Sequence, residues 1–255
     1  MVRQLSGDAL RRGGLAAAFT FCLALAWEIK SDLSPVTFNS MPAPSTILSL
    51  IAKNFPVMLP HVVSTSKECL FGFLIAAAAG IVLGALIAYS EAALEALYPH
   101  FVFFQIIPKI ALAPLFVVWF GLGSPSRLSF AVFSSFFPTL VATLTGLQAT
   151  RPLYLRLCRS VSAPKWRSFV LVQFPFALPH IFSGLKIAVT MAIIGVVVGE
   201  FITAQIGLGY IIKFASSALE LGLVFAALTL LCVVGLILYG AVVLAERLVL
   251  AKYGG

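Results

Sequence analysis

The chain is 255 residues long, carries a formal net charge of +8, and is 61% hydrophobic with only 10% charged residues. This composition excludes an ordinary soluble domain, because a soluble surface needs far more charge. It does not indicate nucleic-acid binding either, because the Lys and Arg residues stand between apolar runs and not on one soluble face. We expect an all-α, polytopic membrane helix bundle, in which each span needs about 20 apolar residues.

The first apolar stretch begins at Leu15, after three arginines within the first 12 residues. Its uninterrupted part ends at Trp27 and resembles the core of a signal peptide, but no small-residue cleavage site follows. We favour an uncleaved first helix over residues 15–33, and a cleaved signal peptide is the alternative. Residues 1–14 are then a cytoplasmic N-terminus, and residues 15–255 are a single transmembrane domain.

A proline-rich segment follows the first helix. Within it, residues 45–55 are expected to form a short helix that is capped by Ser45 and stops before Pro56. This helix is too short to cross a bilayer, so we expect it to lie along the outer surface.

Five further apolar runs have the length of a span. The run over residues 101–120 contains Lys109, and the run over residues 176–202 spans only if Lys186 and Glu200 are tolerated. With the first helix, the prediction is six spans. The five later runs are residues 69–89, 101–120, 128–150, 176–202 and 221–245.

Small side chains recur at every fourth position of the second expected span, which places them on one helix stripe. Such a stripe lets another backbone approach closely. We favour packing within the same subunit, and a seam between two copies is the alternative. The stripe consists of Gly72, Ala76, Gly80, Gly84 and Ala88.

The loops between the spans predict their orientation. The loop over residues 150–175 contains five Lys or Arg residues between 151 and 167, and no acidic residue. Short cytoplasmic loops carry an excess of positive charge, so this loop and both chain termini are predicted to face the cytoplasm.

The same loop has the pattern of a short amphipathic helix. Thr150 is expected to cap it, Pro152 stands in its first turn, and the residue before Pro164 disfavours its continuation. The apolar side could lie on anionic lipid headgroups or fit a groove on a cytoplasmic partner, and spacing does not separate the two. The apolar side comprises Leu153, Tyr154, Leu157 and Val161, and the polar side comprises Arg156, Arg159 and Ser160.

The residues after this helix carry a resemblance. S-V-S-A-P-K-W-R-S-F (160–169) and F-P-F-A-L-P-H-I-F-S-G-L-K (174–186) resemble the signature loop of binding-protein-dependent ABC transporter permeases. That loop runs roughly E-A-A-x-x-x-G-A-x-x-x-x-x-F and ends in P-x-x-L-P-x-I-x-x-G-L. The matching residues are Ala163, Phe169, Pro175, Leu178, Pro179, Ile181, Gly184 and Leu185.

Other segments extend the resemblance over nearly the whole chain. The segments M-P-A-P-S-T-I (41–47), P-K-I-A-L-A-P-L-F-V-V-W-F-G-L-G (108–123) and E-F-I-T-A-Q-I-G-L-G-Y (200–210) are similar to the nitrate/sulfonate/taurine group of these permeases. Two positions depart from the family pattern. The acidic residue of the family is replaced by Arg156, and its turn glycine by Ser162, which indicates a modified turn.

The resemblance implies the permease subunit of an ATP-driven importer in the bacterial plasma (inner) membrane. It would form, as a homodimer in lipid, the path for a sulfonate-, taurine- or nitrate-like anion or a vitamin precursor delivered by an external solute-binding protein. A pair of cytoplasmic ATP-binding subunits would handle the ATP, because this chain has no G-x-x-x-x-G-K-[ST] sequence, so we expect neither a cofactor nor an enzymatic activity of its own. The residues expected to couple to the ATPase are Leu153, Arg156, Leu157, Arg159, Val161, Ser162, Ala163 and Lys165.

Charged residues within spans need partners or water. Lys109 follows Pro108, and a helix broken there would line a cavity. Lys109 and Glu200 are therefore candidates for flanking a solute path, with Gln105 and Gln205 as further polar candidates. A structural ion pair, or a snorkelling lysine, is the alternative.

A metal site and a different transport mechanism are the remaining alternatives. The four cysteines and three histidines are scattered without metal-ligand spacing, so no metal site is expected. An ion-coupled secondary transporter is the alternative function. It would need a relay of acidic residues within the membrane, for which Glu200 is the one candidate.

Overall fold

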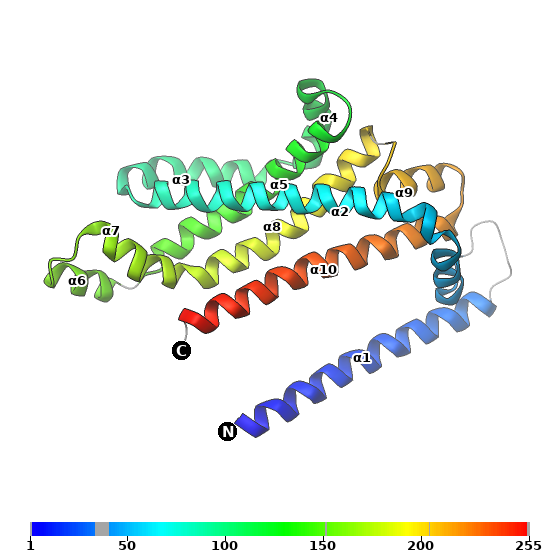
Figure 1. Cartoon of the computed structure of the whole chain (residues 1–255), viewed down its shortest axis with the longest axis horizontal. Helices are drawn as coiled ribbons and strands as arrows, with labels where there is room; N and C mark the ends of the chain where they lie inside the picture. Colours follow the sequence, from blue (N-terminus) through cyan, green and yellow to red (C-terminus); the bar gives the residue numbers. More distant parts are fainter. Residues whose placement is uncertain (1, 34–40, 151, 204, 254–255) are drawn as a thin grey trace. The chain divides into compact units, whose positions relative to one another are not determined.

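The structure is a computed structural model that describes residues 2–33, 41–150, 152–203 and 205–253, with the side chains of residues 2–13, 16, 17, 32, 33 and 253 left out. Among these residues there are helices and short connections but no strand, so the expected all-α fold is confirmed (Figure 1). The chain forms two compact units, Met1–Leu59 with Ile211–Thr229, and Pro60–Tyr210 with Leu230–Gly255. In chain order the elements are α1 (Val2–Leu33), α2 (Pro44–Ala88), α3 (Glu91–Ile106), α4 (Lys109–Phe120), α5 (Ser124–Gln148), α6 (Pro152–Ser160), α7 (Lys165–Ser168), a π-helical segment (Phe169–Gln173), α8 (Phe174–Thr203), α9 (Leu208–Ser217) and α10 (Leu221–Tyr253).

The smaller unit joins α1 to the beginnings of α2 and α10. The Glu28 carboxylate accepts hydrogen bonds from the backbone N–H of Ser45, at 3.1 Å, and from its hydroxyl group. The rings of Trp27 and Phe225 lie 5.9 Å apart, measured between centroids. A carboxylate and an aromatic ring of α1 therefore hold two segments that are distant in sequence.

Helix α2 differs from the prediction. It begins at Pro44 and continues without interruption through Pro56 and Pro60 to Ala88, so the short surface helix ending before Pro56 is wrong. Ser45 does not cap it, because its hydroxyl donates to Glu28. A proline inside a helix removes one backbone hydrogen bond, but membrane helices tolerate the residue well, so Pro56 was a weaker stop signal than expected.

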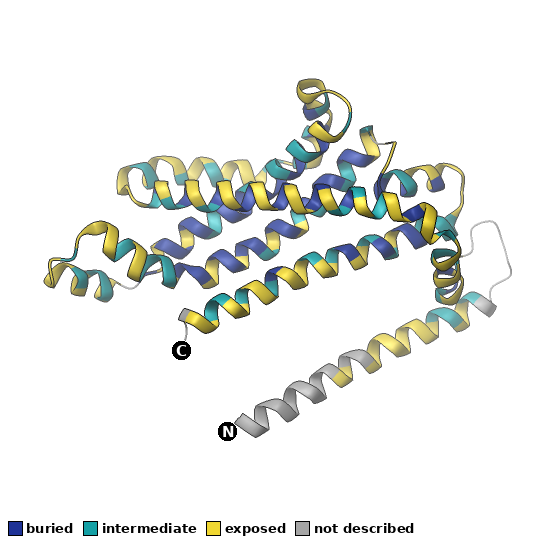
Figure 2. Ribbon diagram, viewed as in Figure 1, coloured by how far each residue is buried: buried dark blue, intermediate teal, exposed yellow. Residues whose placement is uncertain are grey.

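The larger unit is built on the pairing of α5 with α8, which pack extensively against each other. Both helices are buried along much of their length, as the dark blue ribbon of Figure 2 shows. Apolar residues of α2 and α10 complete the core around this pair. The buried core cluster includes Phe73, Leu147, Ile181, Phe182, Val189 and Val242.

The stripe of small residues on α2 packs against α5 within the same subunit, as we favoured. A Cβ atom added at Gly80 would lie 2.9 Å from the Cβ atom of Thr139, and one added at Gly84 would lie 2.9 Å from that of Thr143. Real Cβ atoms do not approach so closely, so this contact between the two helices depends on glycine at both positions.

Four helical segments of the described chain are long and apolar enough to cross a membrane, and a fifth is added if α3 and α4 form one bent span. This is fewer than the six predicted. The first predicted span lies in α1, which is helical but is not among these segments, and part of its side chains lies outside the described residues. The four segments are Pro44–Ala88, Ser124–Gln148, Lys165–Thr203 and Leu221–Lys252.

The charged residues of α8 have partners inside the larger unit. The Lys186 ammonium lies 2.5 Å from the Glu246 carboxylate of α10. Glu200 is fully buried and is bonded to the hydroxyl group of Thr65 in α2. Each partner offsets part of the cost of placing a charged side chain in a membrane helix.

Candidate functional site

The first candidate site is the exposed hairpin formed by α6 and α7. Pro152 is the first residue of α6, where a missing N–H group costs nothing. Thr150 does not cap the helix as expected, since its buried hydroxyl oxygen has no hydrogen-bond partner among the described residues. The hairpin therefore begins with the proline, without a side-chain cap from Thr150.

The turn after α6 explains how serine replaces the glycine of the family pattern. Ser162 adopts φ +54°, the left-handed conformation that favours glycine. The N–H of Ser162 donates to the carbonyl of Arg159 at 3.0 Å, and the N–H of Ala163 donates to the carbonyl of Cys158 at 2.9 Å. These two bonds form a Schellman motif that ends the helix. The turn is kept in the left-handed geometry although the residue is serine.

The apolar side of α6 contains one side chain that packs against the rest of the chain and three that stay exposed. The ring of Tyr154 stacks on Phe176 at the start of α8, with centroids 5.0 Å apart. Beside Tyr154 on the same apolar side, Leu153 is 71% exposed, Leu157 60% and Val161 68%. These three lie at i, i+4 and i+8 and form an apolar strip, which we call the α6 strip.

Basic residues flank the α6 strip. Arg156, Arg159 and Lys165 are exposed, and Ser162 is exposed in the turn, while Ala163 is half-buried. The hairpin thus presents an apolar strip with positive charge beside it. An acidic groove with an apolar floor would complement this surface.

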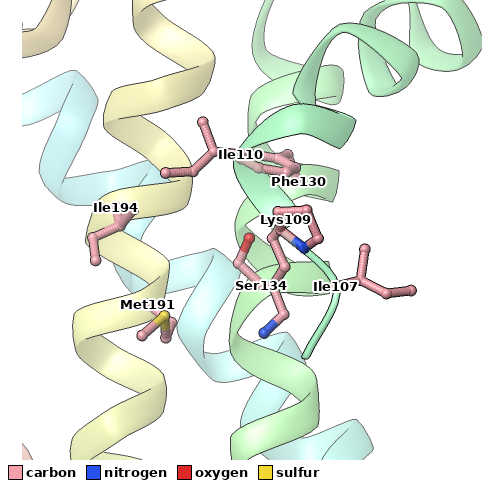
Figure 3. Close-up of a pocket in the computed structure, with 8 residues that line it drawn as sticks. Ile107, Lys109, Ile110, Phe130, Ser134, Met191 and Ile194 are labelled. Carbon is pink, nitrogen blue, oxygen red and sulfur yellow. The ribbon is translucent and has the colours of Figure 1, made fainter. Parts of the chain in front are cut away.

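The second candidate site is a cavity beside the break between α3 and α4. The predicted third span is interrupted at Ile107 and Pro108, and the two helices meet at an angle of 95°. A cavity of about 290 Å³ lies next to this break, as the sequence led us to expect, and Lys109 lines it (Figure 3). Its walls come from α4, α5 and α8 and are mostly apolar. The lining residues are Ile107, Pro108, Lys109, Ile110, Phe130, Ser134, Met191 and Ile194.

Glu200 is not part of that cavity. Its carboxylate accepts a hydrogen bond from Thr65 at 2.7 Å and one from the backbone N–H of Gly209, also at 2.7 Å. Thr65 in turn accepts from the N–H of Leu208 at 2.8 Å, and the N–H of Gly207 donates to His61 at 3.0 Å. We call this set the α8–α9 clamp, because it fastens the start of α9 to α2 and α8.

The remaining polar candidates are separated from one another. Gln105 is exposed near the end of α3, and Gln205 is exposed in the connection between α8 and α9. No ion pair between Lys109 and Glu200 is present in the described part of the chain. The structure therefore separates the residues that the sequence grouped into one path.

Sequence reasoning missed two polar features. Glu68 of α2 and Arg127 of α5 form a buried, bidentate ion pair with N–O distances of 2.5 and 2.8 Å. The partners are 59 residues apart, so no local pattern announces them. Ser134 was also missed, because a serine in a membrane helix normally bonds to its own backbone, as Ser135 does to the carbonyl of Ala131 at 2.8 Å.

Comparison with known proteins identifies the class. Residues 80–250 match the family described as "Binding-protein-dependent transport system inner membrane component". This match covers more than half of the chain and includes α5, the hairpin, α8 and nearly all of α10. The chain belongs to this family and is the permease subunit of an ABC importer, a multi-pass inner-membrane component without enzymatic activity.

Individual relatives agree with the family assignment. A Haemophilus influenzae protein named "probable ABC transporter permease protein" is 33% identical over 85% of this chain and 89% of its own length. The formylaminopyrimidine transport permease protein ThiX of Halalkalibacterium halodurans is 32% identical over 91% and 93%. The riboflavin transport system permease protein RibX of Chloroflexus aurantiacus is 30% identical over 89% and 85%.

Proposed function

We propose that this permease works as a homodimer that takes its energy from a pair of cytoplasmic ATP-binding subunits through the α6 strip. Each copy would place one hairpin on one ATP-binding subunit, as a two-fold axis requires. ATP would be bound by the partner and not by this chain. An external solute-binding protein would deliver the solute to the opposite side of the membrane.

The exposed α6 strip is the observation that carries this proposal. An apolar strip of three side chains, each more than half exposed, is costly in water and typical of a helix that docks in a groove. The contact between Tyr154 and Phe176 joins α6 to the start of α8. A movement of the docked hairpin would therefore reach α8, which packs along α5 in the membrane core.

The proposed orientation places both chain termini in the cytoplasm. The positively charged loop over residues 150–175 supports it, since basic loops stay on the cytoplasmic side. Lipid headgroups offer a second attraction for Arg156, Arg159 and Lys165. Contact with a partner accounts better for the α6 strip, because its apolar side chains stand beside these charges on the exposed surface.

The solute belongs, in our proposal, to the class of small anions and vitamin precursors. Relatives named as permeases for formylaminopyrimidine, riboflavin, nitrate and taurine support this range. Lys109 would lie on the solute path. Gln105 and Gln205 would contact the solute at the two entrances of that path. The burial of Glu200 favours a positioning role, in which it fixes the start of α9 beside the path.

The test of coupling is Val161→Glu. A carboxylate on the α6 strip would be buried without a partner in the docked state, so we expect uptake and association with the ATP-binding subunit to fall roughly tenfold or more. Uptake in cells and co-purification of the ATP-binding subunit measure the two effects. The matched control is Ser160→Glu, which adds the same charge at the adjacent exposed position and leaves the three apolar side chains of the strip in place.

The two variants separate the competing explanations. If Val161→Glu transports and associates as the unchanged chain does, the docking of the α6 strip is refuted. If both variants fail equally, negative charge anywhere on the hairpin is harmful, and contact with anionic lipid replaces docking as the explanation. Uptake that persists after deletion of the ATP-binding subunit would instead indicate an ion-coupled carrier.

A further inference from the structure

The cavity beside the break between α3 and α4 contains two polar groups that nothing in the described structure satisfies. Lys109 makes no hydrogen bond or ion pair with any described residue, and its ammonium group lies over the ring of Phe137, 5.9 Å from the ring centroid. Ser134 is only 4% exposed, and its hydroxyl oxygen is buried without a partner. A buried hydroxyl without a partner is costly, so its retention requires an explanation.

Both groups line the same cavity. In Figure 3 the Lys109 side chain enters from the start of α4 and runs past Ser134, whose hydroxyl group points toward the side of Phe130 and Ile110. The other walls are hydrocarbon, sulfur and the ring of Phe130. An apolar cavity lined by a few polar groups is the usual form of a small-molecule site, and about 290 Å³ suits a small ligand.

The depth of the cavity fits a transport path. Ser134 is the eleventh residue of α5, about 15 Å along that helix at 1.5 Å per residue, and Met191 lies about 18 Å from the end of α8 by the same measure. Both positions are near the middle of the two helices that form the membrane core. A lysine that contributes to this cavity without a carboxylate partner leaves a positive charge for a ligand to neutralise.

We propose that this cavity is a solute-binding site that recognises an anionic group. The ammonium group of Lys109 pairs with the anion, the hydroxyl of Ser134 donates a hydrogen bond to it, and Phe130, Met191 and Ile194 contact the apolar body of the solute. This inference rests on the proposed function, because it names the part of the solute path that selects charge. It is independent of the docking of α6.

The test measures the charge preference at Ser134. Ser134→Cys is placed in a chain whose four native cysteines are replaced by alanine, and the transporter assembled with its partner subunits is held in lipid nanodiscs without ATP. The new thiol is reacted with an anionic reagent, sulfonatoethyl methanethiosulfonate, and with its cationic trimethylammonium analogue. We expect the anionic reagent to be favoured, and Lys109→Met to lower the anionic-to-cationic rate ratio roughly tenfold or more.

Competition and a conservative variant complete the experiment. Ethanesulfonate should protect the thiol better than neutral diethyl sulfone, and this difference should disappear in Lys109→Met. Lys109→Arg should keep the ratio near that of the unchanged chain, and Lys109→Gln replaces Lys109→Met if the latter does not assemble. These controls separate loss of charge from loss of structure.

Three results would overturn the proposal: a thiol that reacts with neither reagent, a rate ratio that does not respond to removal of the Lys109 charge, and equal protection by the two competitors. Because labelling is done without ATP, a failure of α6 docking leaves these rates unchanged. A failure here likewise leaves the Val161→Glu result unchanged, so the two proposals are tested separately.

Discussion

At the scale of single residues, the polar groups of the membrane helices are mostly satisfied by partners far away in sequence. Glu200 is fully buried and is held by Thr65 and Gly209, and Arg127 is held by Glu68. A buried carboxylate that accepts a hydrogen bond from a side-chain hydroxyl group and one from a backbone N–H group fixes both donors. The α8–α9 clamp thus sets the direction in which the chain enters α9.

Gly207 is the residue on which the α8–α9 clamp depends most. Its φ of +129° is a conformation that residues with a side chain rarely adopt, and an added Cβ atom would fall on the Glu200 carboxylate. We expect Gly207→Ala to destabilise the protein by about 3 kcal/mol, from backbone strain and displacement of the carboxylate. The midpoint of thermal unfolding in detergent measures the change.

Gly240→Ala is the matched control, because no atom lies within 4 Å of a Cβ added there and the residue is in the middle of α10. That substitution should change stability by less than about 1 kcal/mol, and in the stabilising direction. An unfolding midpoint of Gly207→Ala equal to that of the control would mean that the α8–α9 clamp is not rigid.

The sequence predicted some of these residues and could not predict others. Lys109 stood out because a charge beside a proline interrupts an apolar run, and the structure has both the break and the cavity there. Ser134 did not stand out, because whether a serine bonds to its own helix depends on its rotamer and neighbours. The partners of Glu200 and Arg127 depend on how helices meet, which no local pattern encodes.

At the scale of elements, the contact between α2 and α5 depends on small residues. Gly72, Gly80 and Gly84 each leave room for a side chain of α5, with distances of 2.9 Å from an added Cβ atom to the facing Cβ atom. Helices in lipid have little hydrophobic force to hold them together, so close van der Waals contact and buried ion pairs carry the association. The pair of Glu68 and Arg127 joins the same two helices.

Gly80→Val tests this contact. The larger side chain would have to displace Thr139 and the backbone of Leu140, so we expect a loss of about 1–3 kcal/mol, as for overpacked cores. Ala79→Val is the control, since Ala79 is the adjacent residue on the same helix and is exposed. Equal unfolding midpoints of the two variants in detergent would contradict the close packing of α2 on α5.

The elements themselves were predicted unevenly. The long apolar runs gave α5, α8 and α10 within a few residues at most ends, because length and hydropathy determine such helices. The prolines of α2 predicted a helix end that is wrong, because the helix continues through them. The proline between α3 and α4 predicted a break that is present. Pro108 lies between two helices that meet at a wide angle and both pack on α5, and tertiary contacts of that kind decide whether a proline interrupts a membrane helix.

At the scale of the whole molecule, the chain combines the apolar membrane helices of the permease family with an exposed hairpin that carries basic residues beside an apolar strip. The membrane helices account for the family match and the inner-membrane placement. The hairpin accounts for how such a chain, which lacks an ATP-binding motif, could be driven by a partner. The departures at Arg156 and Ser162 change its charge and one turn residue, but the turn keeps the left-handed geometry.

The most direct test of this account is the side of the membrane on which the hairpin lies and what covers it there. Leu153→Cys, in a chain whose native cysteines are replaced, is labelled with a membrane-impermeant maleimide, and Glu220→Cys in the connection between α9 and α10 is the control for the opposite side. We expect Cys at 153 to be labelled in inside-out vesicles but not in intact cells, and to be protected when the ATP-binding subunit is bound. Labelling in intact cells, or equal labelling with and without that subunit, would contradict the account.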